Sequence, residues 1–218
     1  MTLTHAEMRA VYDRLGALLD SQAFYEDRAL AEMIAHGDFA HAHSVFEFGC
    51  GTGRLAAWLL TDHLPPEASY TAIDVSPRMV ALASARLALW HDRVTVTASD
   101  GTPHLPLADG TCDRVVSTYV LDVLSDEDID AVLAEARRVL DAADGRLCLV
   151  SLSWGTTGFS RLVSRAWRGI YRIRPALLGG CRPIALSHYL SEAAWTPIHQ
   201  DRVTRFGVTS EIVVAQSR

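Results

Sequence analysis

The sequence contains no lysine: all 20 of its lysine-or-arginine positions, among 218 residues, are arginine. A Schiff base with a carbonyl compound or with pyridoxal phosphate needs a lysine amine, and a Walker-type phosphate loop needs a lysine that reaches the phosphates. The sequence therefore excludes both kinds of site.

Cysteine is also scarce. The four cysteines are widely separated and form no Cys-x-x-Cys pair, so neither a zinc site nor a disulfide framework is indicated. We expect Cys112 and Cys148 to be core residues, because both fall within predicted strands. His36, His41 and His43 precede the first predicted strand, but no Cys or His group at metal-site spacing accompanies them, so we expect a solvated loop there and no metal.

Long apolar runs are missing. No run reaches the 18 or more residues of a membrane-spanning helix, and the N-terminus lacks the charged-then-apolar layout of a signal peptide. We therefore expect a cytoplasmic protein without a transmembrane segment. With 49% hydrophobic residues, a chain of this length can bury a substantial core as one domain. Its net charge of −6 disfavours a nucleic-acid partner.

The most informative feature that is present is a glycine-rich turn. The apolar segment 45–48 leads into Gly49-Cys50-Gly51-Thr52-Gly53, and a helical pattern follows. Glycines permit positive φ and let a ligand approach the main chain, while the amides that open the next helix face that ligand. Dinucleotide loops follow Gly-x-Gly-x-x-Gly, but here the third glycine comes one position early and Arg54 stands at the expected site. Glu47 would repel a phosphate but suits a cationic amino group beside a sulfonium, as in S-adenosylmethionine.

Three further strands are predicted after the glycine turn. The segment 70–76 carries Asp74 near its end, 94–98 is followed by Ser99-Asp100-Gly101, and the fourth strand is expected over 112–121. A carboxylate at the end of a strand has two acceptor oxygens, which can take both hydroxyls of a ribose.

In this order and spacing, Glu-x-Gly-x-Gly-x-Gly and the later strand ends resemble the motifs of class I S-adenosylmethionine-dependent methyltransferases, of the type 11-like group, with looser similarity to quinone and phospholipid methyltransferases. The similarity covers about residues 40–155. It implies an α/β fold, a doubly wound Rossmann-like seven-stranded sheet, mostly parallel with an antiparallel last strand, and helices on both faces. It also implies that S-adenosylmethionine contacts Glu47, Gly49, Cys50, Gly51, Gly53, Asp74, Val75, Ser99, Asp100, Gly101, Thr118 and Tyr119.

We expect a single methyltransferase domain over 1–218. Its parts are an N-terminal helical cap (1–40), a cofactor-binding core (41–155), a substrate-side insertion (156–200) and a C-terminal hairpin (201–218). The helical segments within 5–35 should pack over the cofactor end. Helices should begin at Ser76, where a proline follows, and at Ser125, because serine is a preferred N-cap. The strand around 212–215 should insert antiparallel between its neighbours.

The segment 145–191 contains seven arginines and no aspartate or glutamate. A helix over 159–174 would place four of them on one face and three apolar residues largely on the other: Arg161, Arg165, Arg168 and Arg172 against Val163, Trp167 and Ile170. Three interpretations stay open: a lid whose apolar face covers the cofactor cleft, an ordinary solvated face, and a reversible contact with an anionic membrane surface.

We expect an S-adenosylmethionine-dependent methyltransferase that acts on a small, apolar or partly anionic molecule of the quinone, lipid or secondary-metabolite class. Positioning supplies much of the rate in such a reaction, so a base is not obligatory; the candidates are Asp122, His188 and Tyr25. The residues expected to contact the substrate are Tyr119, Asp122, Trp154, Arg165, Trp167 and Arg168. The alternatives are a nucleotide-dependent oxidoreductase, in which Asp74 would bind the ribose of NAD, and a non-catalytic S-adenosylmethionine-binding protein.

Overall fold

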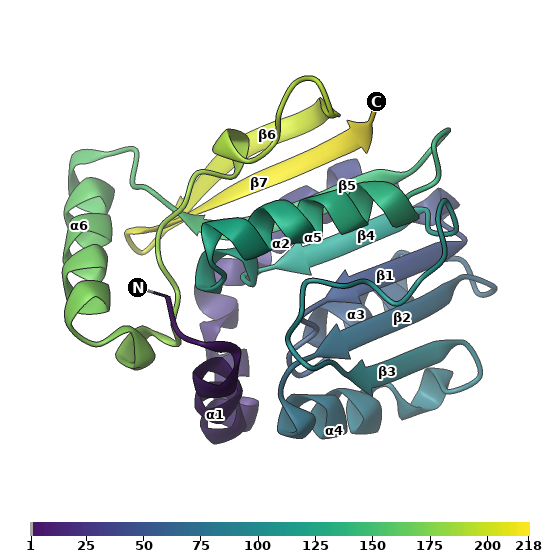
Figure 1. Ribbon diagram of the computed structural model, residues 1–218, viewed down its shortest axis with the longest axis horizontal. Helices are drawn as coiled ribbons and strands as arrows, with labels where there is room; N and C mark the ends of the chain where they lie inside the picture. The colour runs from purple at the N-terminus through teal and green to yellow at the C-terminus, as the bar shows by residue number, and fades with distance from the viewer. Residues whose placement is uncertain (1) are drawn as a thin grey trace.

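The computed structural model describes residues 2–218. They contain one seven-stranded sheet with the order β3-β2-β1-β4-β5-β7-β6. The strands are β1 (Ser44–Phe48), β2 (Ser69–Asp74), β3 (Val94–Ala98), β4 (Arg114–Thr118), β5 (Arg146–Ser153), β6 (Trp195–Arg205) and β7 (Val208–Ser217). Strands β1 to β5 pair in parallel, and β7 is antiparallel to both of its neighbours, β5 and β6 (Figure 1). The expected mixed sheet is confirmed.

Helices cover both faces of the sheet. They are α1 (His5–Leu15), α2 (Ala23–Gly37), α3 (Arg54–Asp62), α4 (Pro77–Arg86), α5 (Asp126–Val139) and α6 (Gly158–Ile173), with short 3₁₀ turns η1 (Gly16–Gln22), η2 (Phe39–His41), η3 (Ala88–Trp90), η4 (Leu121–Val123), η5 (Pro175–Leu178) and η6 (Leu186–His188). In Figure 1, α5 lies in front of the sheet and α2 and α3 lie behind it. The core is accordingly two apolar layers, one built on α5 and the other on α2 and α3. Strands β1, β4 and β5 are buried nearly throughout, as parallel strands covered on both faces must be.

Serine caps set the helix starts that the sequence predicts. Ser76 Oγ accepts the amide of Met79 with Pro77 in the first turn of α4, and Ser125 Oγ accepts the amide of Asp128 at the start of α5. Each cap satisfies an amide that would otherwise lack a partner within the helix. Helix α4 ends at Arg86, and the short turn η3 follows it.

The C-terminal hairpin begins earlier than expected. Strand β6 starts at Trp195 rather than at 201, and the turn falls between Arg205 and Val208. Pro197 makes the early part of β6 look like a loop in the sequence. Proline is tolerated there because β6 is an edge strand, and a bulge interrupts its register between Pro197 and His199.

The cysteines expected in the core, Cys112 and Cys148, are buried. Within residues 2–218, no helix combines the length and the apolar character needed to cross a membrane.

Candidate active site

The site lies where the parallel strands end. A cavity of about 290 Å³ opens at the carboxyl ends of β1, β2 and β4, next to α1 and α2. The arrowheads of these strands in Figure 1 end on the side where α1 lies. Strand β1 lies between β2, which follows it in the sequence, and β4, which comes only after β3. The strand order therefore reverses at β1, and ligands of open α/β sheets bind at such a switch point.

The glycine turn follows β1 and is tied to the neighbouring strand. The amides of Gly49 and Cys50 both donate to the Ile73 carbonyl, at 2.9 and 3.0 Å. Gly49, Gly51 and Gly53 have φ of 79°, 53° and 74°, in the left-handed region that favours glycine. A Cβ on Gly53 would lie 3.0 Å from that of Ala83, so this glycine allows α3 and α4 to approach, and it does not line the cavity.

Asp74, at the end of β2, holds the glycine turn. Its Oδ2 accepts the amide of Gly51 and its Oδ1 accepts the amide of Ser76, both at 2.8 Å. Burial raises the pKa of Asp74, and these two amides oppose that rise. Each carboxylate oxygen keeps a second lone pair. The carboxylate therefore fixes the turn and can still accept ribose hydroxyls from a ligand in the cavity, which it lines.

Glu47, on β1, is a buried carboxyl beside the same turn. Only 1% of its surface is exposed, and its Oε2 accepts the hydroxyl of Tyr70 at 2.9 Å. Burial raises the pKa of Glu47 to about 7; the Tyr70 hydroxyl opposes the rise and Asp74 adds to it. The cavity thus has an acidic end that would be stabilised in its ionised form by a cationic ligand.

Replacing Glu47 by Gln is expected to flatten the pH dependence of stability. The pKa of Glu47 rises from 4.5 to about 7 on folding, so between these values the folded state keeps a proton that the unfolded state releases. The resulting stabilisation is complete below pH 4.5 and is lost as the pH rises through 7. In denaturant unfolding, the stability of the parent minus that of Glu47→Gln should fall by roughly 1 to 3 kcal/mol from acid pH to mildly basic pH. A pH-independent difference would contradict this account.

Asp122 lies in η4, just after β4. Its Oδ2 accepts the amide of Leu152 at 2.8 Å, and its Oδ1 is buried without a hydrogen-bond partner within residues 2–218. The Ser151 hydroxyl is buried and also lacks a hydrogen-bond partner, and it is close enough to lower the pKa of Asp122. Burial raises the pKa of Asp122 to about 7, against the lowering effect of Leu152 and Ser151. A carboxyl with this pKa and a vacant acceptor position can take a proton near neutral pH.

Residues of the N-terminal helical cap contact the glycine turn and the helices after it through charged side chains. Arg54 contacts Glu26 at 2.6 Å and also Asp27. Thr52 donates to Asp20 at 2.5 Å, and Arg86 contacts both of them. These contacts join η1 and α2 to the residues that follow the turn.

Most of the sequence-predicted residues come together in this cavity. Those that line it are Glu47, Gly49, Cys50, Gly51, Asp74, Val75, Ser99, Gly101, Thr118, Tyr119, Asp122, Trp167 and Tyr25. Tyr119 has a φ of 56°, which is unusual for a residue with a Cβ. This backbone conformation is not compatible with a strand, so β4 ends at Thr118 instead of the expected 121, and the chain turns there into the cavity wall. The Tyr119 hydroxyl pairs with Ser210 Oγ at 2.7 Å.

Besides Gly53, five predicted residues do not line the cavity. Asp100 turns back to accept from both the amide and the hydroxyl of Thr102, so Glu47 and Asp74 converge as expected but Asp100 does not. His188 is exposed on η6, Trp154 lies under the Arg168 guanidinium at 5.2 Å, and Arg165 and Arg168 are exposed. The local sequence could not show that these side chains point away, because orientation depends on distant packing.

Sequence reasoning did not identify several residues of the cavity wall. They are Tyr12, Asp20, Glu26, Arg54, Leu177, Leu178 and Cys181. Tyr12 and Cys181 interact through the phenol and the thiol, and burial raises the pKa of both groups. Their partners lie far away in the sequence, so only the fold brings them together. Arg54 is the exception, because the sequence already shows it at the position where a dinucleotide loop has its third glycine.

The face of helix α6 that packs against the protein is not the one that the sequence suggests. The face against the protein consists of Ser160, Ser164, Trp167 and Tyr171, of which only Trp167 reaches the cavity; its indole N–H donates to the Cys181 carbonyl at 3.0 Å. The expectation that Val163, Trp167 and Ile170 together face the cleft is therefore wrong: Ile170 is exposed. The inward face contains the small residues Ser160 and Ser164, and because serine is polar, the sequence does not identify this face as buried.

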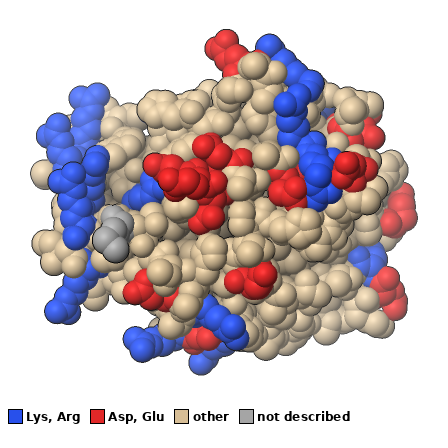
Figure 2. Space-filling view, in the orientation of Figure 1, with Lys and Arg blue, Asp and Glu red and all other residues tan. Residues whose placement is uncertain are grey.

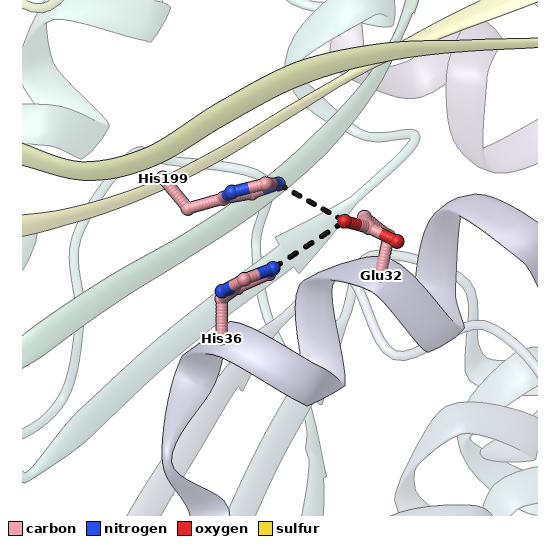
Figure 3. A group of neighbouring side chains, drawn as sticks. All are labelled: Glu32, His36 and His199. Atoms are coloured by element: carbon pink, nitrogen blue, oxygen red, sulfur yellow. Dashed lines mark ion pairs between the residues drawn. The ribbon is translucent and has the colours of Figure 1, made fainter.

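The expectation that His36, His41 and His43 lie together in a loop before β1 is wrong, because His36 belongs to α2 and His41 to η2. His36 lies in the last turn of α2, and its ring stacks on His199 of β6 at 3.7 Å and 9°, with both Nε2 atoms 3.3 to 3.4 Å from the same Glu32 oxygen (Figure 3). The three ligand atoms lie within 4.8 Å of one another. A metal binds imidazole in the ring plane, and two parallel rings do not point at one ion, so this group serves as a contact between α2 and the edge strand.

Comparisons with known proteins agree with this geometry. Residues 45–143 match the family model described as a methyltransferase domain. A malonyl-[acyl-carrier protein] O-methyltransferase from Geobacter sulfurreducens is 31% identical over 69% of this chain and 54% of its own length. The chain thus spans about half the length of this relative.

Solved structures share the fold at low sequence identity. The [4+2]-cyclase SpnF superposes with a TM-score of 0.74 at 17% identity, covering 99% of this chain and 97% of that one. The N-methyltransferase NodS from Bradyrhizobium japonicum, in complex with S-adenosylhomocysteine, gives 0.70 at 18% identity, covering 97% and 98%. Together with the glycine turn and the strand order, the family match shows that this chain carries a class I S-adenosylmethionine-dependent methyltransferase domain.

Proposed function

We propose that the chain transfers the methyl group of S-adenosylmethionine to a small, largely apolar acceptor that carries a neutral hydroxyl or similar proton-bearing nucleophile. The observation that supports this proposal best is one cavity with two different ends. Glu47, Asp74 and the glycine turn form the first end, and Tyr12, Trp167 and Leu178 belong to the second.

The residues at the first end fit S-adenosylmethionine. The backbone of Gly49 and Gly51 has no Cβ to obstruct a ligand, Asp74 has free lone pairs for ribose hydroxyls, and Glu47 offers a carboxylate to the cationic amino group. When bound, this molecule supplies an activated methyl group on a sulfonium. The protein's part is then to orient the acceptor in line, exclude water and receive a proton, and orientation alone can contribute roughly 7 to 11 kcal/mol.

The second end determines the acceptor class in this proposal. Tyr12, Tyr25, Trp167 and Cys181 line it together with leucines, and Asp122 is its carboxyl. Arg54 is the only arginine among the cavity-lining residues within 2–218, and it is occupied by Glu26 and Asp27 next to the glycine turn. An anionic acceptor would meet Asp122, and Arg182, the cation whose charge lowers the pKa of Asp122, does not line the cavity. This favours the apolar acceptor class over the anionic one.

A matched pair of acceptors tests the proposal. Transfer of labelled methyl from S-adenosylmethionine should be at least roughly tenfold faster to an alkylphenol than to a malonyl thioester, the group in the name of the Geobacter relative, because a carboxylate placed near an ionised Asp122 is disfavoured by more than 1 kcal/mol. An alkylbenzoate of the same size as the phenol serves as the control for shape. A clear preference for either carboxylate would contradict the proposed acceptor class.

The sequence is compatible with two other functions. A nucleotide-dependent oxidoreductase is disfavoured by the antiparallel β7 and by the buried carboxyl of Glu47 beside the turn. A domain that binds S-adenosylmethionine without transferring methyl is compatible with the fold, since one structural neighbour is named as a cyclase. Asp122, a buried carboxyl with a vacant acceptor position at the far end of the cavity, favours the transfer reaction.

A further inference from the structure

Helix α6 exposes an apolar row to solvent. Phe159, Leu162, Ala166, Ile170 and Ile173 follow one another at spacings of three, four, four and three, which keeps them on one face of the helix. The four large side chains of this row are between 44% and 81% exposed. Since Ser160, Ser164 and Tyr171 form the buried face, the apolar row is not needed to attach α6 to the sheet.

An arginine row runs beside the apolar row. Arg161, Arg165, Arg168 and Arg172 are all exposed, and none of them forms an ion pair with an acidic side chain in the part of the chain that the structure describes. Figure 2 shows basic side chains gathered over α6, while the acidic groups in this view lie mainly over other elements. The segment 145–191 contains no aspartate or glutamate that could neutralise them.

We propose that α6 docks on an anionic phospholipid bilayer, with the apolar row among the acyl chains and Arg165 and Arg172 at the phosphates. A helix of 16 residues is about 24 Å long, so both rows can lie flat along the surface. An apolar face of Phe, Leu and Ile beside arginines, with no acidic residue, is complementary to a surface that is at once anionic and apolar. An acidic protein surface would match the arginines but would leave the apolar row unmatched.

The cavity wall includes residues that lie next to the docked face. Leu177, on the η5 turn that follows α6, is 69% exposed and also lines the cavity, as does Trp167 of α6. An apolar acceptor dissolved in the bilayer would therefore meet the mouth of the cavity at the docked helix. Docking itself does not rest on the proposed reaction, because it concerns the outer faces of α6.

Vesicle sedimentation at low ionic strength tests the docking. The full chain should bind vesicles of equimolar phosphatidylglycerol and phosphatidylcholine and bind pure phosphatidylcholine far more weakly. Arg165→Gln with Arg172→Gln should weaken binding about 25-fold, roughly fivefold for each arginine near an anionic surface. The control, Arg78→Gln with Arg137→Gln, removes the same charge from exposed positions on α4 and α5 and should change binding little.

The apolar row needs its own variant. Leu162→Gln with Ile173→Gln should weaken vesicle binding at least tenfold without loss of folding, because both side chains are exposed, whereas Leu89→Gln on η3 should not. Failure of the parent to bind anionic vesicles, or equal binding by the α6 variants and their controls, would overturn the proposal. Calorimetric binding of S-adenosylmethionine by the same preparations is measured separately, so a failure of the proposed function would be recognised independently.

Discussion

Replacing Asp122 by Asn is expected to lower kcat by at least about a hundredfold with a phenolic acceptor at mildly basic pH, while the affinity for S-adenosylmethionine stays nearly unchanged. Asparagine keeps the shape of the side chain and an oxygen that can accept the Leu152 amide, but it cannot take a proton. The measurement is single-turnover methyl transfer combined with calorimetry.

The pH profile separates a base from a structural carboxyl. The pKa of Asp122 is raised to about 7, and only the ionised form accepts a proton, so kcat of the parent should rise with pH and level off above 7. Asp122→Asn should lose this ascending limb. His188→Ala, an exposed residue outside the cavity, should leave both kcat and the profile unchanged. If Asp122→Asn loses stability but keeps the rate and the pH profile of the parent, Asp122 has a structural role only.

Replacing Gly51 by Val is expected to abolish measurable binding of S-adenosylmethionine. Gly51 has a φ of 53°, which a β-branched residue rarely adopts, and a Cβ there would already lie 3.4 Å from Leu19 on the other side of the cavity. The new side chain would stand in the ligand's path. The strained φ should lower the free energy of unfolding, but the chain should still fold, because the nearest side-chain contact is of ordinary length.

Replacing Asp74 by Ala tests the same end of the cavity by removing acceptors instead of adding bulk. Binding of S-adenosylmethionine should weaken at least tenfold, since a hydrogen bond to a charged group is worth about 1.5 to 3 kcal/mol. The variant also leaves the amides of Gly51 and Ser76 without their partner, so the free energy of unfolding should fall. Asp109→Ala, an exposed carboxylate that contacts Arg138, is the control. Unchanged affinity in Asp74→Ala would exclude a ribose at this position.

The sequence predicts the cofactor end better than the rest because that end is built from strand ends. Glu47, Gly51 and Asp74 each stand at a fixed place relative to a buried strand, and parallel strands bring their carboxyl ends to one edge of the sheet. Asp100 is the exception, since its side chain closes a local turn with Thr102. The backbone position was predictable, but the rotamer was not.

The acceptor end could not be predicted in the same way. Tyr12 and Cys181 meet across the cavity although most of the chain separates them, and no local pattern encodes that contact. In α6 the arginine periodicity is visible in the sequence, but the packed face consists of Ser160 and Ser164, which look like solvent-facing residues. The sequence therefore indicates an amphipathic helix without showing which face packs.

Calorimetric titration of the unmodified chain with S-adenosylhomocysteine and, separately, with NAD tests the central claim most directly. Binding of S-adenosylhomocysteine should be saturable and should be lost in Gly51→Val, and binding of NAD should not be detectable. Binding of NAD without binding of S-adenosylhomocysteine or S-adenosylmethionine would contradict that claim.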